Sequence, residues 1–353
     1  MALAWGPLGH LQAILSSFRY FPILSSPPRV LYNLSAASMN ILFFGTPTYV
    51  APVIHALIEM GHTVKGVITP PDRPAGRGRS MEAPGAKSVA QELGLPVFQP
   101  TSIRTPEIKE LIASLEPHLI LVAAYGKILP PDILSFPRHG CLNLHPSFLP
   151  LHRGPSPVVA ALLEGATTTG ISLMLMDAGI DSGSIVAQQE ETILQGDTGG
   201  ALTARLFHKG ADMMREFLPL WMCAKIHAVP QDDSKATYTK KLSKADGVLD
   251  LSLPAKILER RVRAFIPWPT CNVIWGGKRL KVLGAHPMTM LTTVPMGTPV
   301  GTVVAVTGSL SPGIVTGQGI LVLEILQLEG KKPVAAEEFL QGHPDFLGAL
   351  LPS

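Results

Sequence analysis

One stretch of the sequence holds side chains that could carry out acyl transfer. Residues 141–157 read CLNLHPSFLPLHRGPSP, in which one residue separates Asn143 from His145. On a β-strand alternate side chains share a face, so these two would lie on one face and the neighbouring leucines on the other. Further along, MDAGIDSGSIV places Asp181 in a glycine-rich loop. An amide, an imidazole and a carboxylate brought together suit acyl transfer to an amine.

The chemistry of such a set follows from its residue types. The amide and a protonated imidazole could stabilise the oxyanion of a tetrahedral intermediate, and the carboxylate could orient and charge the imidazole. A histidine near a strand end is more often a structural hydrogen-bonding group, so the residues alone leave both interpretations open. Cys141 has no base assigned to it, and we expect it to pack in the core.

Two glycine-containing segments do not match nucleotide-binding motifs. The turn Gly45-Thr46-Pro47 is not GxGxxG, which makes a nicotinamide site unlikely to be formed there. The run Gly76-Arg77-Gly78-Arg79 lacks the Lys-Ser/Thr pair of a Walker loop.

The elements around these residues alternate between strands and helices, which predicts an α/β domain with a parallel sheet covered on both faces. In such sheets ligands lie beyond the carboxyl ends of the strands, where His145 and Ser147 would sit. Residues 70–84, PPDRPAGRGRSMEAP, are expected to form a loop. The expected strands are 41–44, 64–68, 97–98, 119–124, 141–144, 171–176 and 185–189. One expected helix ends near Met60, and the others span 86–93, 106–115, 156–163 and 198–221.

The pattern changes in the last third of the chain. Residues 228–242 are polar without apolar periodicity, which indicates a linker, and a helix is expected at 255–265. Short alternating runs separated by glycine turns then predict a small antiparallel barrel. These runs span 271–275, 279–284, 300–306, 313–316 and 320–327.

Composition limits the classes of protein. The 353 residues, 46% hydrophobic and 16% charged, suffice for two globular domains. No apolar run reaches the roughly 18 residues of a membrane span. The three cysteines form no CxxC pair, which favours neither disulfides nor zinc. Residues 235–281, the basic segment, contain eleven Lys or Arg and three Asp or Glu. This segment could form a phosphate-binding surface or an ordinary solvated surface.

The first 38 residues differ from the rest. They hold six serines and two arginines but no Asp or Glu. This composition fits a miscalled start, with Met39 as the natural beginning of a cytoplasmic bacterial protein. It also fits a transit peptide, which would place the protein in a mitochondrial or plastid matrix. In either case residues 1–38 should lie outside the fold, and a chain beginning at Met39 should fold and work.

Several motifs resemble those of the methionyl-tRNA formyltransferase family, collinearly from about Met39 to Lys332. The Asn-x-His-x-Ser stretch with its later Asp is common to folate-dependent formyltransferases, whereas PDRPAGRG and RAFIPWP resemble the tRNA enzyme in particular. Three positions, His152, Thr169 and Leu251, depart from the family pattern. The matching segments are FFGTP, PPDRPAGRGR, LPVFQP, AYGKILP, NLHPSFLPLHRG, MDAGIDSG, KLSKADG and RAFIPWP.

The resemblance implies a Rossmann-like formyltransferase domain at 39–227, a linker at 228–242 and a smaller OB-like β-barrel domain at 243–353. It implies 10-formyltetrahydrofolate as cosubstrate and initiator methionyl-tRNA as acceptor, with no metal, no membrane and no obligatory protein partner. The family's catalytic positions fall on Asn143, His145 and Asp181. Its tetrahydrofolate-binding positions fall on Ser147, Phe148, Leu149 and Pro150. Its tRNA contacts fall on Arg77, and the basic segment adds Lys240, Lys241 and Lys244.

Three other functions could use part of this set. A formyltransferase could act on a sugar amine or glycinamide ribotide, a hydrolase could use water, and a tRNA-binding protein could be inactive. The basic segment and the barrel favour tRNA over the first two, and the complete trio favours an enzyme over the third.

Overall fold

The computed structural model describes residues 38–75, 80–289, 295 and 297–352. The predicted N-terminal extension, apart from Ser38, lies outside these residues, and so does Arg77. No helix in the described part of the chain combines the length and the apolar character needed to cross a bilayer.

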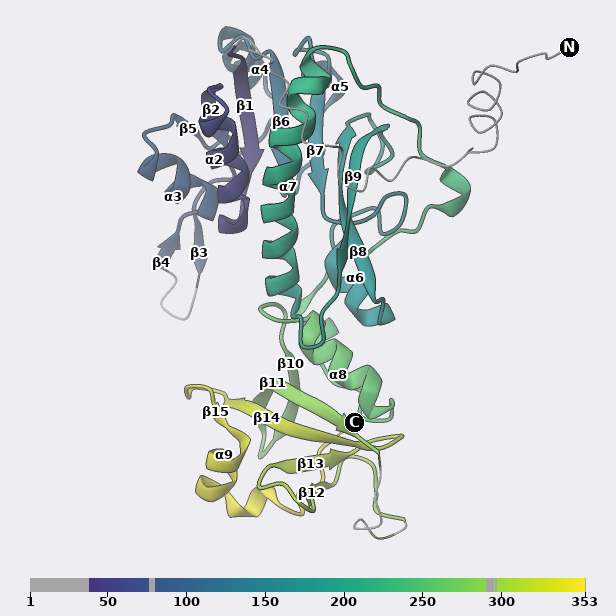
Figure 1. Cartoon of the computed structure of the whole chain (residues 1–353). Helices are drawn as coiled ribbons and strands as arrows, with labels where there is room; N and C mark the ends of the chain where they lie inside the picture. The colour runs from purple at the N-terminus through teal and green to yellow at the C-terminus, as the bar shows by residue number, and fades with distance from the viewer. Residues whose placement is uncertain (1–37, 76–79, 290–294, 296, 353) are drawn as a thin grey trace, which may run out of the picture. The chain divides into compact units, whose positions relative to one another are not determined.

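The first part of the chain forms a seven-stranded sheet in the order β5-β2-β1-β6-β7-β8-β9 (Figure 1). The first five strands in this order are parallel, as predicted, but β8 pairs antiparallel with β7 and with β9. The expectation of an all-parallel sheet is therefore wrong, because apolar patterning reports burial but not strand direction. The strands are β1 Asn40–Gly45, β2 Thr63–Ile68, β5 Val97–Phe98, β6 Leu119–Ala123, β7 Cys141–His145, β8 Thr168–Leu175 and β9 Ile185–Thr192.

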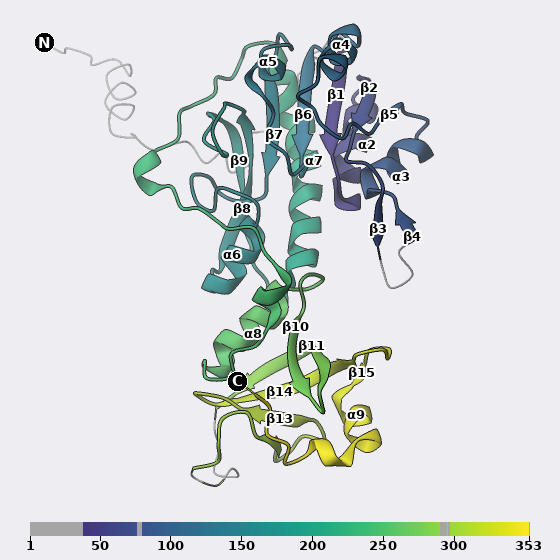
Figure 2. The ribbon, with the colours of Figure 1, turned by 180° about the vertical axis from the view of Figure 1, so that it is seen from behind.

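Both faces of this sheet are covered by helices, as its apolar strands require. In β1, Ile41 and Phe43 join the core beneath α2, α3, α6 and α7, whereas Leu42 and Phe44 join the core beneath α4 and α5. The two views show α7 running along one face of the sheet (Figure 1, Figure 2). The helices are α2 Ala51–Glu59, α3 Gly85–Glu92, α4 Pro106–Ser114, α5 Pro131–Leu134, α6 Pro157–Glu164 and α7 Gly199–Met222.

The segment predicted as a loop at 70–84 contains a β-hairpin at its base. Strands β3 (Arg73–Ala75) and β4 (Ser80–Glu82) pair antiparallel. The prolines of this segment favour a loop, but a two-stranded ribbon has free edges where Pro need not donate a hydrogen bond. The base is anchored through Asp72, which accepts hydrogen bonds from Lys87 Nζ (2.7 Å) and Gln99 Nε2 (2.7 Å).

The last part of the chain contains α8 and a curled antiparallel sheet in the order β10-β11-β14-β13-β12, with β15 paired to β14. These strands match the predicted runs closely, but the sequence pattern did not reveal α9. In this region Phe339 and Phe346 pack edge-on against Trp275. The elements are α8 Ala255–Ala264, β10 Cys271–Trp275, β11 Lys278–Met288, β12 Val303–Ala305, β13 Pro312–Val315, β14 Ile320–Leu328, β15 Val334–Ala335 and α9 Ala336–Gly342.

The packing of α3 gives a stability prediction. A methyl group on Gly85 would lie 2.3 Å from the backbone nitrogen of Thr48, so Gly85→Ala should lower the free energy of unfolding by about 1–3 kcal/mol. Gly342, with no atom within 4 Å of an added methyl, provides the control. Gly342→Ala should be neutral or stabilising by about 0.4–1 kcal/mol. Thermal and urea unfolding measure both, and equal effects of the two variants would contradict this packing.

Candidate active site

The structure brings Asn143, His145 and Asp181 together. Asn143 Nδ2 donates to Asp181 Oδ1 at 3.4 Å, and His145 Nδ1 lies 3.6 Å from Asp181 Oδ2. The backbone N–H of Gly154 donates to the same Oδ2 at 2.8 Å. Asn143 and His145 are buried at the end of β7, and Asp181 is partly exposed. The carboxylate thus touches both other members of the trio.

The two ring nitrogens of His145 have different surroundings. Nε2 lies 3.1 Å from the carbonyl oxygen of His152, which can only accept a hydrogen bond, so Nε2 carries a hydrogen. The other ring nitrogen, Nδ1, faces Asp181. At 3.6 Å this pair is longer than a direct hydrogen bond, so the Nδ1 side of the ring can serve a reacting group.

Asp181 reaches His145 through a fold-back of the turn at 176–184. This turn leaves β8 beside the start of β7, where Met176 N–H donates to the Cys141 carbonyl (2.8 Å). Asp181 then has φ +49°, a left-handed conformation that side-chain-bearing residues seldom adopt. A methyl group on Gly183 would lie 1.8 Å from the carbonyl oxygen of Leu175, so the turn is tight enough to require glycine there.

The loop after β7 has a rigid internal hydrogen-bond network. The Leu149–Pro150 peptide bond is cis, and Ser147 Oγ donates to the Leu151 carbonyl (2.7 Å). Ser172 Oγ donates to the Ser147 carbonyl (2.7 Å) and accepts from Leu149 N–H (3.1 Å). Gln188 Nε2 donates to the Leu149 carbonyl (2.9 Å). The polar groups of the expected folate-binding positions thus shape the loop, and only Phe148 and Pro150 keep partly exposed side chains.

The segment predicted as a linker lies against this same loop. Arg153 N–H donates to the Thr237 carbonyl (2.8 Å), and Thr239 N–H donates to the Arg153 carbonyl (2.7 Å). The Arg153 side chain is only 1% exposed, and its guanidinium donates to Asp233 (2.7 Å) and to the Tyr238 hydroxyl (3.0 Å). The segment therefore forms one wall of the site.

The expected tRNA contacts fall into two groups. Arg77 lies outside the described residues. Lys240, Lys241 and Lys244 are exposed, and Lys240 Nζ lies 2.9 Å from Asp246 Oδ1. The charge of Lys240 is thus partly balanced within the chain.

His152, one of the departures from the family pattern, has two structural roles. Its side chain is buried and pairs with Glu164 Oε2 at 2.9 Å, while its carbonyl accepts from His145. Thr169 is buried in β8, and Leu251 is fully buried in the core. The contacts with Asp181 come from Asn143, His145, Gly154 and Gln231, so none of these three departures lies among them.

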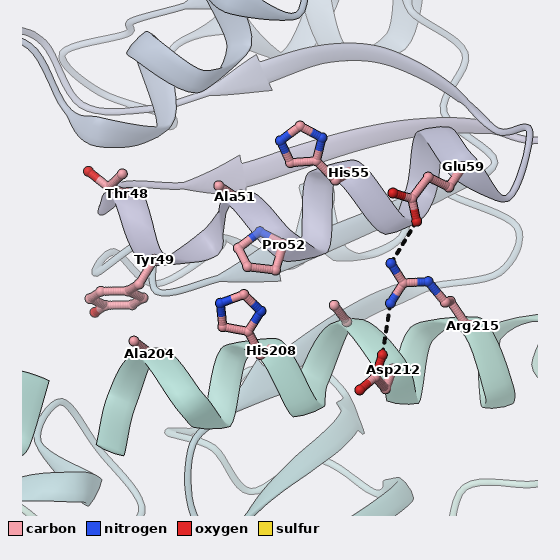
Figure 3. Close-up of a pocket in the computed structure, with 11 residues that line it drawn as sticks. Thr48, Tyr49, Ala51, Pro52, His55, Glu59, Ala204, His208, Asp212 and Arg215 are labelled. Atoms are coloured by element: carbon pink, nitrogen blue, oxygen red, sulfur yellow. Dashed lines mark hydrogen bonds and ion pairs between the residues drawn. The ribbon is translucent and has the colours of Figure 1, made fainter. Parts of the chain in front are cut away.

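Two other features do not contribute catalytic groups. A surface groove of about 820 Å³ lies between α2 and α7, where Arg215 pairs with both Glu59 and Asp212 (Figure 3). Its lining includes no member of the trio. In the described part of the chain, no cluster of three or more His, Cys, Asp or Glu could hold a metal ion.

Comparison with known proteins identifies the family. A formyl transferase family model matches residues 39–218, and a model of the formyl transferase C-terminal domain matches residues 241–344. Methionyl-tRNA formyltransferase of Chloroflexus aurantiacus is 42% identical over 309 residues, 87% of this chain and 98% of that protein. The chain belongs to the methionyl-tRNA formyltransferase family. The enzyme of that name from Myxococcus xanthus is also 42% identical, over 86% of this chain and 95% of that protein.

Solved structures show the same fold in more distant proteins. HypX from Aquifex aeolicus in complex with tetrahydrofolic acid has a TM-score of 0.59 at 16% identity, and this chain spans about half of its length (86% of this chain, 47% of that one). An N-formyltransferase from Helicobacter canadensis, solved with folinic acid and dTDP-3-aminofucose, has a TM-score of 0.57 at 14% identity. That match covers 81% of this chain and 98% of the other.

Sequence reasoning missed several residues that build this candidate site. Gln231 and Arg153 support the Asp181 turn, and Ser172 and Gln188 hold the cis-proline loop. Gln231 lies in a polar segment without periodicity, so nothing in the pattern of the segment itself distinguishes it from other linker residues. Arg153 carried a weak signal, since it is the only Lys, Arg, Asp or Glu between residues 141 and 157.

Cys141 gives a prediction about nucleophilic catalysis. Burial raises the pKa of its thiol to about 12, so thiolate is scarce near pH 7 and forms only as the pH approaches that value. Cys141→Ala should therefore leave kcat within about threefold of the original, at a stability cost of about 1 kcal/mol. Steady-state formyl transfer and thermal unfolding measure the two effects. A loss of turnover of about 100-fold in a folded Cys141→Ala protein would show that the thiol takes part in the reaction.

Proposed function

We propose that the chain transfers the formyl group of 10-formyltetrahydrofolate to the amino group of initiator methionyl-tRNA, using Asn143, His145 and Asp181 as its catalytic residues. The observation that carries the proposal is the Asp181 carboxylate, which touches Asn143, His145 and the Gly154 N–H at once. The identity of 42% to a methionyl-tRNA formyltransferase along nearly its whole length supports tRNA as the acceptor.

The reaction is a direct transfer. The neutral methionyl amine attacks the formyl carbon, and Asn143 and protonated His145 stabilise the oxyanion that forms. Asp181, whose carboxylate lies beside Nδ1 of His145, relays the proton released by the amine. The intermediate then collapses, the bond from carbon to the folate nitrogen breaks, and that nitrogen receives a proton. Holding both substrates in this geometry supplies much of the rate.

The folate binds beside the loop of residues Ser147, Phe148, Leu149 and Pro150. This loop directly follows His145 and is held by Ser172 and Gln188, which makes it a rigid support. The tRNA acceptor end contacts Arg77, and its backbone contacts Lys240, Lys241 and Lys244. Formyltransferase chemistry occupies residues 39–227, and residues 243–353 help to bind tRNA. The protein acts in the cytoplasm of a bacterium, or in an organelle matrix if residues 1–38 are a transit peptide.

The catalytic assignment predicts large losses of turnover. His145→Ala and Asp181→Ala should each lower kcat by at least about 100-fold, the scale of losing an acid–base or oxyanion group. The affinity for 10-formyltetrahydrofolate should change much less. His208→Ala, which removes an exposed imidazole on α7, should leave kcat unchanged. Near-normal kcat in both trio variants would refute the assignment.

The acceptor is tested in the same assay. The wild-type protein is mixed with 10-formyltetrahydrofolate and either charged initiator tRNA or a small amine such as an amino sugar. We expect formyl transfer to the tRNA alone. Transfer to the small amine would support the sugar-amine alternative, and release of formate without an acceptor would support hydrolysis.

The basic residues predict two distinct effects on tRNA use. Arg77→Ala should lower kcat/KM for tRNA by about 1–3 kcal/mol, the range for a charged hydrogen bond. Lys241→Ala and Lys244→Ala should weaken tRNA binding and make it less dependent on salt. Each phosphate contact adds nearly one to the slope of the logarithm of the binding constant against the logarithm of the salt concentration. Kinetics at several salt concentrations separate the two effects.

The exposed residue Arg138 provides a matched control for loss of one positive charge. Arg138→Ala should behave like the wild type with tRNA. Lys240→Ala is a less clean test, because it also frees the Asp246 carboxylate. If Arg77→Ala also behaves like the wild type with tRNA, the role of Arg77 is wrong.

A further inference from the structure

Gln231, in the segment between the two family domains, joins two loops of the candidate site. Its Nε2 donates to the backbone carbonyls of Asp181 (2.8 Å) and Gly183 (2.7 Å). Its Oε1 accepts from Arg153 through Nε (3.0 Å) and Nη2 (2.8 Å). Arg153 directly precedes Gly154, whose N–H holds the Asp181 carboxylate. One amide therefore connects the turn that carries Asp181 with the loop that caps it.

The orientation of this amide is determined by its neighbours. A guanidinium has only donors, so the amide oxygen must face Arg153. The two hydrogens on Nε2 then match the two carbonyls, which can only accept. Arg153 is itself held in place, since it is buried and bound by Asp233 and by the Tyr238 hydroxyl. The Gln231 side chain is thus fixed at both ends.

The Asp181 turn requires such support. Its φ of +49° lies in the left-handed region, and side-chain-bearing residues persist there only where their surroundings hold them. Gly154 N–H holds the carboxylate, but a hydrogen bond to a side chain does not fix the backbone behind it. The two donations from Gln231 go to backbone carbonyls of the turn and so hold that backbone directly.

We propose that Gln231 is a positioning residue for formyl transfer: it holds the Asp181 turn so that the carboxylate reaches His145 and Asn143. This inference rests on the proposed function, in which Asp181 is catalytic. It assigns the segment at 228–242 a part in the chemistry in addition to joining two domains. In this role Gln231 contacts neither the amine nor the formyl group, and it acts only through Asp181.

Gln231→Glu tests the positioning role without removing the anchor. A carboxylate keeps one oxygen for the two Arg153 donors and makes that contact charge-assisted, so the fold should be retained. It cannot donate to the carbonyls of Asp181 and Gly183 and places an oxygen against them. We expect kcat to fall by about 10–100-fold, because misplacing a reacting group by about 1 Å can cost 100-fold. KM values for folate and tRNA should stay within about threefold, and Tm within about 3 °C.

Two further variants complete the comparison. Gln195→Glu makes the same charge change at an exposed residue after β9 and should leave kcat unchanged. Gln231→Met removes both sets of hydrogen bonds, so it should lower Tm as well as kcat. A crystal structure of Gln231→Glu should show the Asp181 carboxylate displaced from the Gly154 N–H by about 1 Å or more.

The outcomes separate this inference from the proposed function. Wild-type kcat in Gln231→Glu, a change in KM alone, or an undisplaced Asp181 would each overturn the positioning role. Wild-type protein that does not formylate methionyl-tRNA would instead refute the proposed acceptor. In that case the release of tetrahydrofolate, which reports loss of the formyl group to any acceptor, still compares Gln231→Glu with the wild type.

Discussion

The candidate site depends on one constraint: the Asp181 carboxylate must point at His145 and Asn143 from a backbone conformation that aspartate seldom adopts. The turn that carries it is tight at Gly183, capped by the Gly154 N–H and supported by Gln231. Each of these contacts comes from a different segment of the chain. The rigid loop after β7 and the docked segment at 228–242 are therefore parts of one arrangement around a single carboxylate.

The direction of β8 explains how Asp181 reaches the trio. If β8 ran parallel to β7, the turn after it would begin at the same carboxyl edge of the sheet as His145. Because β8 runs antiparallel to β7, the turn instead begins beside Cys141 and folds back over the face that carries Asn143 and His145. The three side chains therefore meet through this turn and not through a shared edge of the sheet.

Much of the fold could be predicted because apolar periodicity reports burial directly. The apolar run at 41–44 predicted a strand with helices on both faces of its sheet, and in the structure Ile41 and Phe43 join one core and Leu42 and Phe44 the other. Strand direction and the hairpin at 73–82 could not be predicted, since they depend on pairing partners that local patterns do not encode. The short helix α9 was missed because its seven residues are too few to show a helical period. Gln231 is the clearest example, because its partners Asp181 and Arg153 lie 50 and 78 residues away in the chain.

In the proposed mechanism the formyl group passes directly from folate to the amine. Rapid-quench single-turnover kinetics, with folate labelled in the formyl group, excess enzyme and charged initiator tRNA, distinguish this route from a covalent enzyme intermediate. Direct transfer predicts that label leaves the folate and appears on the tRNA with the same single rate constant, and that none becomes covalently bound to the protein. Label that accumulates transiently in a covalent protein adduct, or that leaves the folate before it reaches the tRNA, would refute direct transfer.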